Sequence, residues 1–137
     1  MAIVKKAMTF GREVLMAALL LSTLLASAAH AADRMPWSAA AFAAAQEAGK
    51  SIIVDVNASW CPICAKQKPT IAALEKDPKF ADAVVFSVDF DTQKDALKQL
   101  GVSTQSTLIA FKGKTEKARW TGVTDPGHIR ALFERAL

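Results

Sequence analysis

The clearest indication of the fold of this chain is the segment SIIVDVNASWCPIC at residues 51–64. Residues 51–57 form a short, apolar, β-branched run with one acid, Asp55, inside it. Such a run predicts a central strand that is covered on both faces. Pro62 then stands where proline favours the first turn of a helix. The stretch therefore predicts a strand that leads through a short loop into a helix, with Cys61 and Cys64 at the junction.

Helical and extended patterns alternate on either side of this stretch. Ser38, Thr92 and Asp125 belong to the residue types that favour helix N-caps, and each precedes a helical pattern. Pro69 predicts a kink in its helix, and Gly113 suits a type II′ turn between two β-leaning runs. The predicted elements, in order, are helix 37–49, strand 51–57, a helix from residue 62, strand 84–89, helix 93–100, strands 107–112 and 115–121, and a helix after residue 125.

This order of elements predicts an α/β fold. Crossover helices make the first strands parallel, whereas the hairpin makes the last pair antiparallel. We therefore expect a three-layer α/β sandwich, with a mixed central sheet of two or three parallel strands plus an antiparallel hairpin, flanked by helices. About 100 residues remain after the first 31, which suits a single domain over residues 32–137.

Residues 1–31 have the three parts of a secretory signal, namely a basic start, an apolar stretch over 14–25 and small residues before Ala31. The uncharged stretch is shorter than the roughly 20 residues that a spanning helix needs. This favours cleavage near Ala31 over a retained anchor, so we expect a periplasmic protein that meets the membrane only through its signal. The net charge of +4 comes from scattered Lys and Arg residues, and no nucleic-acid partner is expected.

The two cysteines, Cys61 and Cys64, are spaced C-x-x-C where the predicted strand meets the predicted helix. A thiolate at a helix N-terminus meets unpaired N–H groups and the positive end of the helix dipole, which lower the pKa of a thiol. Cys61 is therefore predicted to be the nucleophile, and Cys64 the shielded resolving thiol. Two other interpretations remain: a structural disulfide, or a thiolate metal site, for which His128 is the one histidine left after cleavage.

This stretch resembles the active site of the thioredoxin family, in which an Asp precedes the first Cys by six residues and a Pro follows the second by five. Asp55 and Pro69 hold both spacings, and the similarity extends from about residue 37 to residue 137. The resemblance implies a thioredoxin-like fold. It also implies a thiol–disulfide oxidoreductase that forms a Cys61–Cys64 disulfide and needs neither a cofactor nor a metal.

The resemblance makes Asp55 the buried carboxylate beneath the cysteine pair. Burial favours the neutral form of a carboxyl group that has no partner, and this suits proton exchange with Cys64. The other interpretation is an acid bound to backbone N–H groups. Trp60 would pack beside the pair and shape the surface where a substrate lands, unless it serves only as ordinary aromatic packing.

One departure from the family lies in the loop before residue 107. Thioredoxins place a cis-proline there, whereas this chain has Ser106 after Gln105. A cis bond before Ser costs ~3 to 4 kcal/mol, against under ~1 before Pro, so a trans peptide is expected. In the family the backbone of this loop pairs with substrate, which makes Gln105 and Ser106 candidate substrate contacts. The Ser106 hydroxyl could face a sulfur or bond its own backbone.

The residues between the cysteines bear on the direction of electron flow. Pro62 after the nucleophile is typical of periplasmic oxidases and glutaredoxins, whereas Ile63 offers no charge or hydrogen bond to stabilise an extreme oxidant. With Trp60, these two residues are predicted to contact substrate. We expect a monomeric reductase of protein disulfides that a membrane electron donor re-reduces. The alternatives are a disulfide oxidase or isomerase, and a non-enzymatic binder of a metal or cluster.

Overall fold

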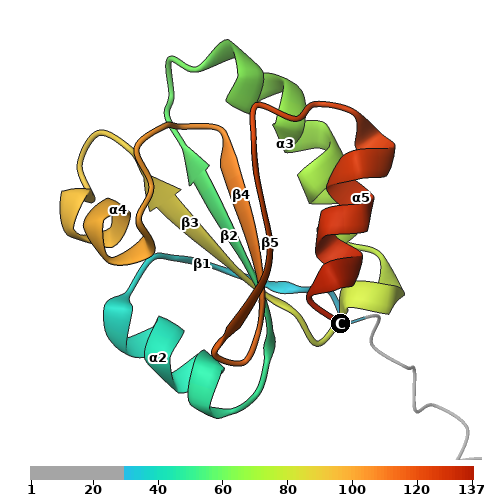
Figure 1. Ribbon diagram of the computed structural model, residues 1–137. Helices are drawn as coiled ribbons and strands as arrows, with labels where there is room; N and C mark the ends of the chain where they lie inside the picture. The colour runs from blue at the N-terminus through green and yellow to red at the C-terminus, as the bar shows by residue number, and fades with distance from the viewer. Residues whose placement is uncertain (1–29) are drawn as a thin grey trace, which may run out of the picture.

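A mixed β-sheet forms the centre of the computed structural model, which describes residues 30–137 (Figure 1). The strands are β1 (Asp33–Pro36), β2 (Ser51–Asn57), β3 (Val84–Asp89), β4 (Thr107–Lys112) and β5 (Thr115–Thr121). They lie in the order β1-β3-β2-β4-β5. The first three in this order are parallel, β4 is antiparallel to β2, and β5 is antiparallel to β4. The predicted mixed sheet and its hairpin are confirmed.

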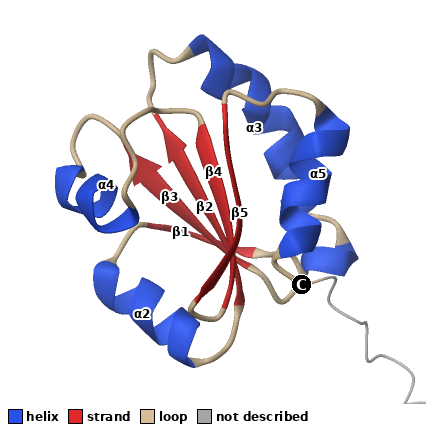
Figure 2. Ribbon diagram, viewed as in Figure 1, coloured by secondary structure: helices blue, strands red, loops and turns tan. Residues whose placement is uncertain are grey.

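Helices cover both faces of this sheet, as Figure 2 shows. They are α2 (Ala39–Glu47), α3 (Pro62–Glu75), α4 (Lys94–Leu100) and α5 (Pro126–Arg135), with a short 3-10 helix, η1, at Pro78–Phe80. α2 and α4 lie on one face of the sheet, and α3 and α5 lie on the other (Figure 1). The described part of the chain is therefore the three-layer α/β sandwich that the sequence predicts.

The central strand β2 sends its side chains alternately to the two faces of the sheet. Ile52, Val54 and Val56 are fully buried in the core beneath α2 and α4, whereas Ile53 is fully buried in the core beneath α3 and α5. Alternation turns Asp55 to the same side as Ile53. The prediction of a strand covered on both faces is confirmed, and the acid within it faces the helix that begins at the cysteines.

Strand β1 is an element that the sequence pattern did not predict. Its four residues, DRMP, include no β-branched side chain and end in proline, so neither composition nor alternation marks them as extended. β1 pairs in parallel with β3 at the edge of the sheet, where Arg34 lies opposite Val85. An edge position tolerates proline because one side of the strand needs no ladder hydrogen bonds.

Two of the three predicted helix caps are confirmed. The side chains of Ser38 and Asp125 accept backbone N–H groups in the first turns of α2 and α5. The prediction for Thr92 is wrong, because α4 begins after Gln93 and the Thr92 side chain does not cap it. The Thr92 backbone N–H instead donates to Asp89 Oδ1 at 2.9 Å. An acid at the end of β3 therefore organises the turn that Thr92 was expected to close.

The remaining local predictions concern a turn and a proline. Gly113 has a φ of 54°, and within residues 30–137 the positive φ values outside glycine are confined to Ser106. Positive φ at the first turn position alone is the signature of a type II′ turn, as predicted. Pro69 lies inside α3, which continues from Pro62 to Glu75 without a break.

The predicted export signal, residues 1–31, lies almost entirely outside the described residues and stays a prediction. Among residues 30–137, no helix has the length and apolar character needed to cross a membrane.

Candidate active site

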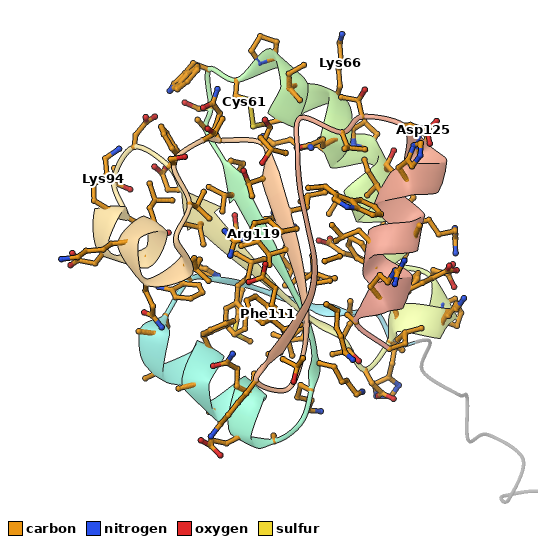
Figure 3. The ribbon with its side chains drawn as sticks, viewed as in Figure 1. Cys61, Lys66, Lys94, Phe111, Arg119 and Asp125 are labelled. Carbon is orange, nitrogen blue, oxygen red and sulfur yellow. A yellow bond between two sulfur atoms is a disulfide. The ribbon has the colours of Figure 1, made fainter. Side chains whose placement is uncertain are left out.

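Cys61 and Cys64 form a disulfide at the N-terminus of α3, with their Cα atoms 5.3 Å apart. Figure 3 shows Cys61 at the end of the sheet where β2 leads into α3. Cys61 is the N-cap of this helix, and its Sγ accepts the backbone N–H of Cys64 at 3.1 Å. The first cysteine therefore meets an N–H group that would otherwise lack a partner, at the end of the helix where the dipole favours negative charge.

The disulfide is enclosed by apolar side chains, and both cysteines are 2% exposed. They cluster with Ala58, and Ile63 and Phe90 pack against them. The sequence predicted a shielded Cys64, and the structure shows that Cys61 is shielded as well when the pair is oxidised. Trp60, Pro62 and Ala65 are the exposed residues directly next to the two cysteines, so a substrate would meet these side chains before the sulfur atoms.

Trp60 is the most exposed large apolar residue of the described chain, at 56%. Its indole Nε1–H donates to Asp91 Oδ2 at 2.8 Å. Asp91 follows β3 and has no counterpart in the sequence motif around the cysteines, so sequence reasoning missed this partner. The hydrogen bond holds the indole ring on the surface beside the disulfide, which differs from ordinary interior aromatic packing.

Asp55 is buried, and it is paired with a cation that the sequence did not reveal. Its carboxylate oxygen Oδ2 lies 2.7 Å from Arg34 Nη2, and the two side chains are 4% and 35% exposed. Partial burial alone would lower the pKa of Arg34, but the hydrogen bonds from its guanidinium to Asp55 and Glu75 raise that pKa above its ordinary value. In the sequence, Arg34 is marked only as a single basic residue shortly after the predicted cleavage site, and nothing there links it to Asp55.

The loop that precedes β4 approaches the same end of the sheet as the cysteines. Thr107, the first residue of β4, pairs with Val56 near the end of β2. Ser106, the residue just before β4, therefore lies next to the end of β2. The described residues contain no cis peptide bond, which confirms the expected trans bond between Gln105 and Ser106. The Ser106 hydroxyl donates to the Gln105 carbonyl oxygen at 2.6 Å. It therefore bonds its own backbone, and the alternative in which it faces a sulfur atom is wrong.

Ser106 is 5% exposed and has a φ of 57°, in the left-handed region that disfavours residues with a Cβ atom. Its carbonyl oxygen accepts two hydrogen bonds, from the Gly122 N–H at 2.9 Å and from Gln67 Nε2 at 3.3 Å. Gln67 lies in α3 at 1% exposure and also donates to the Val123 carbonyl at 2.8 Å. This buried amide ties the helix of the cysteines to two loops, and sequence reasoning missed it because Gln67 reads as a surface residue of that helix.

The left-handed backbone of Ser106 predicts an unusual order of stability among its variants. Ser106→Gly should leave the free energy of unfolding within about 0.5 kcal/mol of wild type. The relief of strain and the loss of the hydroxyl hydrogen bond are each worth about 1 kcal/mol and oppose one another. Ser106→Ala keeps the strain and loses the hydrogen bond, so it should be less stable by about 1 kcal/mol. Urea denaturation measures both, and an alanine variant more stable than the glycine variant would contradict the argument.

Ligand-bearing side chains do not gather elsewhere in the described chain. Within residues 30–137 there is no group of three or more His, Cys, Asp or Glu residues placed to hold a metal ion. His128 lies in α5 and bonds Asp125, the N-cap of that helix.

The sequence model of the thioredoxin family matches residues 35–135, which is most of the chain. The chain belongs to the thioredoxin family. It is 33% identical over 81 residues to a thioredoxin H-type of Fagopyrum esculentum, a match that covers 59% of this chain and 68% of that protein. A thioredoxin H-type of Oryza sativa subsp. indica is 36% identical over 78 residues, covering 57% of this chain and 62% of that protein. The match thus spans about two thirds of the length of these relatives.

Solved structures agree with the thioredoxin assignment. The crystal structure of Trxlp from Edwardsiella tarda EIB202 superposes with a TM-score of 0.71 at 44% identity, over 73% of this chain and 98% of that one. Thioredoxin O2 from Arabidopsis thaliana, solved in an oxidised state, superposes with a TM-score of 0.62 at 29% identity, over 76% of this chain and 94% of that one. This member of the thioredoxin family is a thiol–disulfide oxidoreductase, with Cys61 and Cys64 as its redox-active pair.

Proposed function

We propose that this thioredoxin is exported and reduces disulfides in proteins outside the cytoplasm. The observation that carries the proposal is the Cys61–Cys64 pair at the N-terminus of α3, where Cys61 Sγ already accepts a helix N–H group. Such a position stabilises a thiolate, which is the form of cysteine that attacks disulfides.

The reaction follows from the two sulfur atoms and their surroundings. In the reduced protein the Cys61 thiolate attacks a substrate disulfide, forms a mixed disulfide and releases one substrate thiolate. Cys64 then loses its proton and attacks Cys61 Sγ, which forms the Cys61–Cys64 disulfide and breaks the bond to the second substrate sulfur. Two electrons pass to the substrate, and a membrane electron donor restores the dithiol. Asp55 is the base proposed to take the proton of Cys64, because it faces α3 from within the sheet.

The substrate surface is proposed to consist of the exposed side chains around the pair and the loop before β4. Trp60 and Pro62 are exposed and Ile63 is half-buried, which offers apolar contact around a disulfide that is itself 2% exposed. Gln105 and Ser106 contribute backbone from the neighbouring loop. Because both cysteines are shielded, a substrate must press against this surface to reach Cys61, and this favours disulfides in flexible or unfolded chains.

Export is supported by the position of Ala32. Its backbone nitrogen donates to the Glu75 carbonyl oxygen at 2.7 Å, at the C-terminal end of α3. Cleavage after Ala31 would leave a charged amino group there, where the helix dipole favours a cation, and it would leave all five strands intact. Fractionation of the producing cells, with mass measurement of the mature protein, tests this. We expect a periplasmic monomer that begins at Ala32.

The reductase assignment is tested by insulin reduction and by the reduction potential. The wild-type protein, supplied with dithiothreitol, should accelerate the precipitation of insulin. Its potential against glutathione should lie near the thioredoxin value of about −270 mV rather than near the oxidant value of about −120 mV. No acceleration would overturn the reductase assignment, and a potential near the oxidant value would favour the disulfide oxidase.

A further inference from the structure

Arg34 joins three elements around the buried acid. From the edge strand β1 its guanidinium reaches Asp55 of β2 through Nη2 at 2.7 Å and Glu75 of α3 through Nη1 at 2.6 Å. The Glu75 side chain is 16% exposed, whereas that of Asp55 is 4% exposed. A guanidinium presents its donors in a rigid fork, so one side chain holds both carboxylates in fixed directions.

The paired carboxylate lies on the side of the sheet where the second cysteine is located. Cys64, Lys68 and Ile71 are spaced by four and three positions along α3 and therefore share one helix face. Lys68 and Ile71 line a cavity of about 460 Å³ together with Asp55, Arg34 and Glu75. The Asp55 carboxylate therefore shares a cavity with residues of the helix that carries Cys64.

We propose that Arg34 is a positioning residue that holds Asp55 oriented as the base for the resolving step. The proposal rests on the role of Asp55 in the proposed function. The Asp55 side chain is 4% exposed, and the charge-assisted hydrogen bond from Arg34 fixes the direction of its carboxylate. With Arg34 in place, Asp55 takes the proton of Cys64 as Cys64 Sγ attacks Cys61 Sγ. The substrate thiolate leaves, and the proton on Asp55 then passes to water in the cavity.

Two other charged groups lie beside this pair, and each limits the expected effect of removing Arg34. Glu75 competes for Arg34 from α3, and Lys68 lines the same cavity from that helix as a second cation. Ser87 and Asn57 also line the cavity from β3 and β2, but they are neutral. The Asn57 side chain is engaged with the Asp55 carbonyl and with Ser87 Oγ. Arg34 is therefore the cation that directly contacts Asp55, and Lys68 supplies the residual positive field.

The test follows the reduced protein as it reacts with the chromogenic disulfide 5,5′-dithiobis(2-nitrobenzoate) in a stopped-flow instrument. Attack by Cys61 releases the first coloured thiolate, and resolution by Cys64 releases the second. General-base assistance raises a reaction rate by about 10² to 10⁴-fold. The loss in Arg34→Met should be at the lower end of that range or below it, because Lys68 still lines the cavity as a cation in this variant. We therefore expect Arg34→Met to slow the second release about tenfold at mildly acidic pH. The first release should keep its rate, and the second should recover as the pH rises.

Three further variants make the outcome decisive. Arg34→Lys keeps the charge and should restore much of the second release. In an Asp55→Asn background, Arg34→Met should cause no further loss, because Arg34 acts through Asp55. Arg130→Met is the matched control, since Arg130 pairs with Asp77 at 3.0 Å on the exposed surface, and it should leave both releases unchanged.

Several results would overturn the role of Arg34. The first is that Arg34→Met releases the second thiolate with the wild-type rate and pH profile. The second is that Arg34→Met slows both releases equally. The third is that adding Arg34→Met to Asp55→Asn slows the second release further. If Arg34→Met fails to fold, Arg34→Lys decides instead, and a full loss of the second release in that folded variant also overturns the proposal. Failure of the proposed function looks different, because the wild-type protein itself would then release both thiolates without reducing insulin.

Discussion

Cys61→Ser is expected to reduce insulin-disulfide reduction to the uncatalysed background, a loss of more than about three orders of magnitude, as seen when an enzyme loses its nucleophile. Cys61 is the N-cap of α3 and the sulfur that accepts a helix N–H group, so it is the thiol placed to start the exchange. A serine oxygen at the same place has the geometry but cannot form or break a disulfide.

The partner variant separates the two cysteines. Cys64→Ser leaves the nucleophile in place and removes the resolving thiol, so the protein should accumulate a mixed disulfide with its substrate. Mass spectrometry after alkylation measures this adduct. Ser59→Ala, an exposed residue two positions before Cys61, is the matched control and should keep wild-type activity. Full activity in Cys61→Ser would refute the assignment of the nucleophile, and an adduct on Cys64 in that variant would reverse the two roles.

Phe86→Ala is expected to cost about 3–5 kcal/mol of unfolding free energy, as large core truncations do. Phe86 lies in β3 with no exposed surface and makes edge contacts with the rings of Trp37 and Phe42, with centroids 5.9 Å and 5.7 Å away. Alanine would leave a cavity where β1, α2 and the sheet meet. Since domains of this size are stable by only about 5–15 kcal/mol, the variant should be close to unfolding at physiological temperature.

Urea denaturation of the oxidised protein measures this loss. Leu137→Ala is the matched control, because Leu137 is 49% exposed at the end of the chain, and it should change the stability by less than about 0.5 kcal/mol. A loss below about 1 kcal/mol in Phe86→Ala would mean that the core beneath α2 can collapse around the missing ring.

The site shows how this protein manages without a proline at position 106. Ser106 sits in a left-handed backbone and keeps a trans peptide, and the contacts that hold it come from elsewhere in the fold. Gln67 binds the Ser106 carbonyl from α3, while the Gly122 N–H binds it from the end of β5. The amide oxygen of Gln67 is buried without a hydrogen-bond partner. Burying this oxygen without a partner lowers the stability of the fold, while the amide nitrogen of the same side chain links α3 to the loop before β4.

Local chemistry made a large part of this fold predictable. The apolar run of β2, the proline that opens α3, the glycine of the II′ turn and the Asp125 cap each act within a few residues of themselves, so their consequences can be inferred without knowing the rest of the chain. The same holds for the C-x-x-C pair, since the strand-to-helix junction that makes these thiols reactive is encoded next to them. Thr92 failed as a cap because Asp89 competed for the same turn.

The α/β order, the redox pair and the acid inside the central strand were predictable from patterns of neighbouring residues. The surroundings of these residues became visible in the folded chain: β1 exists, its Arg34 pairs with Asp55, Asp91 holds Trp60 on the surface, and Gln67 reaches Ser106. Each of these contacts joins residues more than twenty positions apart in the chain. Pairing at such distances depends on sheet order and helix packing, which the fold as a whole sets and which no local pattern of residues encodes.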